Sequence, residues 1–165
     1  MKYFNQALQK DINQEYVNAI ELYEESIKRE ETIDAFINLA FLYWQVSSEF
    51  AFRDQYGISD KWLSIGSDRY NLLLNQSIIL FSKNAEPIFW KKYFDHISLG
   101  EELTENDVLN ILKKCEDGLL VPCFFLYLLN PRKYNHQIDE IIAKAKEKPT
   151  SKYLYILSVL QVPLT

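Results

Sequence analysis

The amino-acid sequence predicts an all-α fold: a short right-handed solenoid of antiparallel helix pairs, about nine helices in a single domain over residues 1–165. Apolar residues recur at intervals of three and four along most of the chain, which is the period of a buried helical face. No segment shows convincing strand alternation, and four glycines and five prolines are few for the many turns of an all-β protein. Hydrophobic residues make up 48% of the chain, which suits a packed core.

The first three helices are predicted between residues 2 and 44. Residues 2–11 form a helix with Phe4, Ala7 and Leu8 inward. The next helix buries Tyr16, Ala19, Ile20, Tyr23 and Ile27, and its other face carries Glu21, Glu24 and Glu25, which we expect to be exposed. Thr32 is the expected N-cap of the third helix. That helix carries an apolar stripe of Phe36, Ile37, Leu39, Ala40, Phe41, Tyr43 and Trp44.

The remaining helices follow from caps, prolines and apolar spacing. Residues 46–57 are rich in aromatics without a clear period, so they form a short helix or an ordered loop that packs or binds. A long helix runs from the Ser59 cap to about residue 82, and Gly66 within it indicates a kink or a close helix crossing. Pro87 is expected at the first position of the next helix. Later helices are predicted after the Thr104–Asp107 capping box, after Pro122, around Ile138–Ala145 and after the Ser151 cap.

Residues 16–44 resemble one and a half tetratricopeptide repeats. Ala19 and Tyr23 match the small and aromatic residues of a repeat's second helix, and the third-helix stripe matches the first helix of the following repeat. A weaker resemblance covers residues 74–97. Glu30 and Glu31 stand where this family usually has proline, and about 20 residues are inserted between the two matches, so the chain resembles a degenerate member of the family.

The resemblance implies a concave groove lined by the first helix of each repeat. On this chain it would place Asp34, Asn38 and Phe41 in the groove. Asn38 and Lys92 match two positions of the clamp with which some family members bind carboxylates, but Phe4 and Leu8 fall where other clamp residues belong. A complete carboxylate clamp is therefore not expected.

The charge distribution favours a basic protein partner. Residues 1–60 hold 11 acids and 5 bases, a net charge of −6, whereas residues 61–165 have a net charge of +1. An acidic first third argues against a nucleic-acid footprint there. A merely solvated acidic helix face is the alternative explanation.

Location is predicted from what the sequence lacks. The N-terminal residues MKYFNQALQK have no apolar core of a signal peptide, and no run approaches the length of a membrane span. We therefore expect a cytoplasmic protein with reduced thiols and no membrane partner. The abundance of Ile, Asn, Lys, Tyr and Phe suggests an AT-rich, bacterial genome.

Catalytic and metal-binding patterns are not evident. Asp95 and His96 are adjacent on a helix, so their side chains diverge. Cys115 and Cys123 do not have the spacing of zinc ligands, and the chain has no phosphate-binding or metalloprotease motif. We expect neither a cofactor nor a metal. An enzyme that uses His96, Cys115 or His136 is the rival from another functional class.

The sequence as a whole favours a non-catalytic protein–protein binding module. Its small size, acidic first third and lack of a catalytic constellation suit a bacterial immunity or antitoxin-like inhibitor that neutralises a basic toxin. A general peptide-binding adaptor of the tetratricopeptide type is the alternative within the same class.

Overall fold

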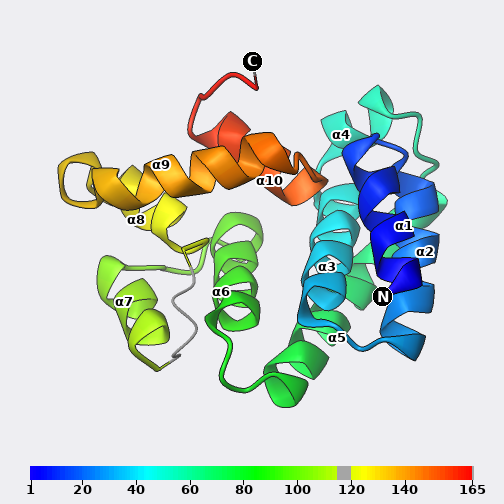
Figure 1. Ribbon diagram of the computed structural model, residues 1–165, viewed down its shortest axis with the longest axis horizontal. Helices are drawn as coiled ribbons and strands as arrows, with labels where there is room; N and C mark the ends of the chain where they lie inside the picture. The colour runs from blue at the N-terminus through cyan, green and yellow to red at the C-terminus, as the bar shows by residue number, and fades with distance from the viewer. Residues whose placement is uncertain (115–119, 165) are drawn as a thin grey trace. The chain divides into compact units, whose positions relative to one another are not determined.

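The structure is a computed structural model that describes residues 1–114 and 120–164. Every regular element in these two ranges is a helix (Figure 1), which confirms the all-α class. The described residues form ten helices where about nine were expected. The additional helix is α4 (Phe50–Gln55), which forms within the aromatic segment that lacked a clear period.

The chain divides into two compact units. The first comprises Met1–Leu80 together with Thr150–Lys152, and the second comprises the described residues of Phe81–Pro149 and Tyr153–Thr165. Because each unit is compact, the packing of each is described separately. The single domain expected over residues 1–165 stays a prediction.

The first unit contains the helices predicted at the N-terminal end. They are α1 (Lys2–Ile12), α2 (Tyr16–Arg29), α3 (Ile33–Ser48), α4 and α5 (Lys61–Leu80). Helix α1 packs against α2, α2 against α3, and α3 against both α4 and α5. The stripe predicted on α2 is buried, as the period of three and four residues requires: Tyr16, Ala19, Ile20, Tyr23 and Ile27.

Helix α3 is buried on every side. All residues from Ala35 to Val46 are buried, including the whole predicted stripe. Thr32 holds the expected N-cap position, but its hydroxyl makes no capping hydrogen bond. A helix that is apolar around its whole circumference belongs in a core, so α3 is the centre of the first unit.

Helices α3 and α5 cross closely at Gly66. A Cβ atom at this position would lie 2.5 Å from the carbonyl oxygen of Tyr43 and 3.1 Å from a methyl of Val46. Gly66 is therefore explained by the close crossing, one of the two alternatives that its place within a helical pattern suggested.

A buried carboxylate joins distant parts of the first unit. Asp11 is fully buried, and it accepts hydrogen bonds from the Tyr23 hydroxyl at 3.1 Å and from the backbone N–H of Ser151 at 2.7 Å. Tyr23 in turn accepts a hydrogen bond from the Asn38 side chain at 3.1 Å. Ser151 is the first residue of α10, so a carboxylate from α1 caps that helix, whereas the sequence had suggested that Ser151 itself was the cap.

The second unit contains the helices after residue 80. They are α6 (Ala85–Leu99), α7 (Glu105–Lys114), α8 (Cys123–Leu129), α9 (Pro131–Glu147) and most of α10 (Ser151–Val159). Its core is aromatic. Neighbouring rings of this core have centroids 5.2–5.5 Å apart, and its buried members are Phe89, Trp90, Tyr93, Phe94 and Phe124. The Tyr93 and Tyr155 hydroxyls, 2.9 Å apart, connect α6 with α10.

The helix ends of the second unit agree only in part with the predicted ends. The capping box is confirmed, since Thr104 and Asp107 exchange backbone-to-side-chain hydrogen bonds of 3.0 and 3.2 Å. The expectation that Pro87 opens α6 was wrong: the helix begins two residues earlier, where Asn84 accepts from the Glu86 N–H at 2.9 Å. Helix α9 likewise begins before the predicted stripe, at Pro131 behind an Asn130 cap.

We expect Gly66→Ala to destabilise the protein although alanine is the better helix former. The propensity gain is about 1 kcal/mol, but the new methyl would press on the Tyr43 carbonyl, and overpacking of this kind costs about 1–3 kcal/mol. Urea unfolding measures the difference. The neighbouring exposed Ser67→Ala is the matched control and should stabilise slightly; a stabilised Gly66→Ala variant would contradict the close crossing.

The buried Asp11 should make stability depend on pH. Burial raises the pKa of Asp11 from 3.8 to about 6, although hydrogen bonds from Ser151 and Tyr23 and the charge of nearby Lys152 oppose the rise. Folding therefore favours the protonated acid, and this contribution is complete below pH 3.8 and is lost as the pH rises through 6. Relative to Asp11→Asn, which does not titrate, the free energy of unfolding of the wild type should fall by about 2–3 kcal/mol between pH 4 and pH 7.

The check is a series of urea unfolding curves on both proteins across that pH range. NMR of the Asp11 carboxyl carbon follows the same titration directly. A difference between wild type and variant that stays constant with pH would show that Asp11 titrates normally.

Candidate functional site

The three binding residues predicted on α3 lie in different environments. Asp34 is exposed in the first turn of the helix. Asn38 is 5% exposed and its amide is directed to the Tyr23 hydroxyl, and Phe41 is 1% exposed with its ring centroid 5.5 Å from that of Trp44. Asn38 and Phe41 are core residues in this structure, so only Asp34 of the three can be reached by a partner.

The fourth predicted residue, Lys92, lies in the second unit. It is exposed on α6, and its charge acts on Asp107 at the start of α7. The pKa of Asp107 is held below its usual value chiefly by hydrogen bonds from Thr104, to which Lys92 adds a smaller contribution.

The groups considered for catalysis have different surroundings in the described residues. Burial raises the pKa of the Cys123 thiol, which disfavours the reactive thiolate. The Nδ1 atom of His96 lies 2.6 Å from the carbonyl oxygen of Glu101, to which it donates, and His136 is exposed on α9. Cys115 lies outside the described residues. Those residues include no cluster of three or more His, Cys, Asp and Glu side chains that could hold a metal ion.

The aromatic segment after α3 packs for the most part. Phe52 and Tyr56 lie against Tyr16, with ring centroids 4.9 and 4.7 Å away. Phe50 is the exception, since it is 70% exposed with the Arg53 guanidinium 5.8 Å from its ring. These contacts explain two of the three aromatics as packing residues.

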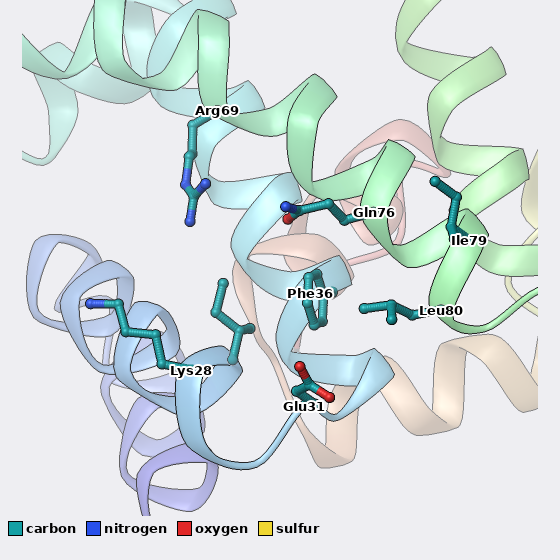
Figure 2. A pocket seen from close by; sticks show the side chains of 8 residues that line it. Lys28, Glu31, Phe36, Arg69, Gln76, Ile79 and Leu80 are labelled. Carbon is teal, nitrogen blue, oxygen red and sulfur yellow. The ribbon is translucent and has the colours of Figure 1, made fainter.

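A groove on the first unit is a candidate binding site. It has a volume of about 390 Å³, within the usual range for ligand sites. Its lining comes from α2, from the turn that follows it, from α3 and from α5: Ile27, Lys28, Glu31, Phe36, Arg69, Gln76, Ile79 and Leu80. We call it the α2–α5 groove. In Figure 2 its α5 side chains face those of α2, and Phe36 lies between them.

The floor of the groove is apolar and its outer part is exposed. Ile27 and Phe36 are buried, whereas Ile79 is 78% exposed and Leu80 is 52% exposed. Removing side chains as large as isoleucine and leucine from water is favourable, so this wall of the groove is suited to being covered by a partner.

A bidentate ion pair fixes one wall of the groove. The Arg69 guanidinium donates to both carboxylate oxygens of Glu24, at 2.8 and 2.7 Å, and the Tyr43 hydroxyl donates to the same carboxylate at 2.9 Å. Opposed influences act on this acid: burial raises the pKa of Glu24, but the bonds from Arg69 and Tyr43 lower it overall. The expectation that Glu24 is an exposed helix-face acid was wrong, since its side chain is 19% exposed and joins α2, α3 and α5.

The cations beside the groove are already neutralised. Lys28 pairs with Glu25 at 3.0 Å, and Arg69 pairs with Glu24. Glu31, in contrast, has no cation partner in the part of the chain that the structure describes, and the same holds for the nearby Asp34. Glu25 also pairs with Arg29 at 3.3 Å, so the paired groups leave no excess negative charge, and what distinguishes the groove is the Glu31 carboxylate without a cation partner among the described residues.

Comparison with protein-family models, with curated proteins and with solved structures finds no match for this chain. The resemblance of residues 16–44 and 74–97 to tetratricopeptide repeats stays a prediction. Among the described residues, no helix is both long enough and apolar enough to cross a membrane.

One feature of the sequence relates to the groove, although helical periodicity alone does not predict the groove from it. Residues 72–74 and 78–80 are two runs of three apolar residues within one helix. Successive side chains on a helix diverge by about 100°, so such a run cannot be buried completely against one neighbour. Leu73 and Leu74 are buried, whereas Leu72, Ile79 and Leu80 are exposed.

The Glu24–Arg69 pair should contribute measurable coupling energy. In a double-mutant cycle with Glu24→Gln and Arg69→Met we expect a coupling of about 1–2 kcal/mol, because the pair is bidentate and mostly buried. The exposed pair Glu25 and Arg29 is the matched control and should give about 0.5 kcal/mol or less. Equal coupling energies in the two cycles, measured by urea unfolding, would show that the wall is not fixed by this interaction.

Proposed function

We propose that this protein is a non-catalytic protein-binding module, an immunity- or antitoxin-like inhibitor that binds and neutralises a basic toxin in a bacterial cytoplasm. The observation that carries the proposal is the α2–α5 groove, in which an apolar floor lies beside the unpaired carboxylate of Glu31. Apolar contacts provide affinity, and unpaired acids steer a basic partner and favour it over acidic competitors.

We further propose that the helix pairs stack as a short right-handed solenoid related to the tetratricopeptide repeat. The order α1, α2, α3 and α5 then corresponds to two repeats, and α4 is an insertion. In this arrangement α2 and α5 are the second helices of the two repeats. The α2–α5 groove thus belongs to the outer side of the stack, and not to the concave side for which Asp34, Asn38 and Phe41 were first considered.

A toxin-rescue assay tests the inhibitor function. The genes that adjoin this one are each expressed alone to find one that arrests growth and encodes a basic protein, and growth of cells making that toxin is then compared with and without co-expression of this protein. We expect the wild type to restore growth, and Glu31→Lys combined with Asp34→Lys to lose at least about tenfold in affinity for the purified toxin, since each reversal places like charges together.

Glu21→Lys combined with Asp54→Lys is the matched control, because it changes the net charge equally at two exposed acids outside the groove. Its affinity should stay within about twofold of the wild type. Association should also slow as salt rises, because screening weakens steering. Equal losses from both pairs would mean that only net charge matters, and failure to restore growth would refute the inhibitor.

A further inference from the structure

Helix α5 exposes a row of apolar side chains along its outer face. Ile65, Leu72 and Ile79 are 44%, 46% and 78% exposed and follow one another at intervals of seven residues. Positions seven apart lie on nearly the same face of a helix, so the row runs along α5 for about 20 Å. The opposite face packs inward through Gly66, Leu73, Leu74 and Ser77.

The row and the α2–α5 groove form one surface. Ile79 belongs to both, and Arg69 and Gln76, which line the groove, each follow a residue of the row by four positions. Residues four apart are neighbours on a helix surface. The apolar row from Ile65 to Ile79 is therefore flanked on one side by the groove, to which it is joined at Ile79 and through the polar side chains of Arg69 and Gln76, and the α5 and α2 side chains of the groove face each other in Figure 2.

We propose that this surface binds one amphipathic α-helix of the partner, laid along α5 with its apolar side chains in the row and the groove. This inference rests on the proposed binding function and specifies the ligand. A seven-residue spacing is what a second helix matches, with anchors at positions i, i+3 or i+4, and i+7. A peptide that binds by strand addition would need a free sheet edge, and the described part of the chain has no strand to provide one.

The charges at the groove indicate which type of residue the partner helix places there. Glu31 is the carboxylate without a cation partner among the described groove residues, whereas Arg69 pairs with Glu24 and Lys28 pairs with Glu25, which also holds Arg29. Helices α2 and α5 end nearby, at Arg29 and Leu80, and carbonyl ends carry negative partial charge. The partner helix should therefore place a lysine or arginine beside Glu31.

A peptide selection tests this assignment without knowledge of the toxin. A displayed library of 18-residue peptides with randomised sequence, which contains helix-forming, extended and proline-rich members, is selected against the full-length protein. We expect enrichment of sequences with Leu, Ile or Phe at helical spacing and a Lys or Arg near one end. Enrichment of extended, proline-rich or acidic sequences, or of none, would overturn the proposal.

Two matched pairs of variants then locate the bound peptide. Leu72→Glu should weaken binding at least about tenfold, whereas Leu63→Glu, on the far side of the same helix and 43% exposed, should change it less than about twofold. Glu31→Lys should weaken binding by about three- to tenfold, and reversing the peptide's basic residue to Glu should restore it; Glu21→Lys should have no effect. Urea unfolding confirms that each variant is folded.

The outcomes separate this proposal from the inhibitor function. If Leu72→Glu leaves the peptide affinity unchanged, the α5 surface is refuted, and the growth assay then tests the inhibitor function on its own. Failure of the growth assay with a positive selection refutes the inhibitor and retains the surface. If the free protein sediments as a dimer that Leu72→Glu dissociates, a second copy occupies α5 and the proposal is overturned.

Discussion

The complete burial of α3 is the constraint on which the first unit depends. A helix with no exposed side from Ala35 to Val46 depends on its neighbours for hydrogen-bond partners, because an unpaired buried polar group costs about 1–3 kcal/mol, although the side-chain oxygen of Gln45 has none. Asn38 donates to Tyr23 of α2, Tyr43 donates to Glu24 of α2, and the carbonyl of Val46 accepts from buried Arg53 of α4 at 2.8 Å. Helices α2 and α4 thus each provide a group that fixes their position relative to α3.

Polar groups of the first unit beyond α3 depend on the same constraint. Tyr23 accepts from Asn38 and donates its own hydroxyl proton to Asp11, and Asp11 also caps α10 through Ser151. The polar chain from α3 thus ends at a group whose pKa of about 6 lies near physiological pH. Glu24 plays the corresponding part toward α5, because it accepts from Tyr43 on one side and from Arg69 on the other.

The sequence predicted the local features well and the long-range ones poorly, for physical reasons. Helical stripes and the Thr104 capping box follow from spacing within a few residues and were predicted correctly, whereas the helix start at Pro87 and the cap at Ser151 were not. Asn38 and Phe41 were misplaced because the family resemblance outweighed a local signal: a helix apolar on all sides is buried. The Glu24–Arg69 and Asp11–Ser151 contacts join residues 45 and 140 positions apart, and periodicity carries no information about such pairs.

The α2–α5 groove combines both kinds of feature, and its rigidity follows from them. Its exposed leucine and isoleucine arise from apolar runs that one neighbouring helix cannot cover, whereas its shape arises from distant contacts. Gly66 holds α5 against α3, and the bidentate bond to Glu24 immobilises Arg69, a long side chain that would otherwise lose about 2 kcal/mol of rotamer freedom on binding. The walls are therefore ordered before a partner arrives, so a docking helix loses mainly its own conformational freedom, and a short apolar contact can give useful affinity.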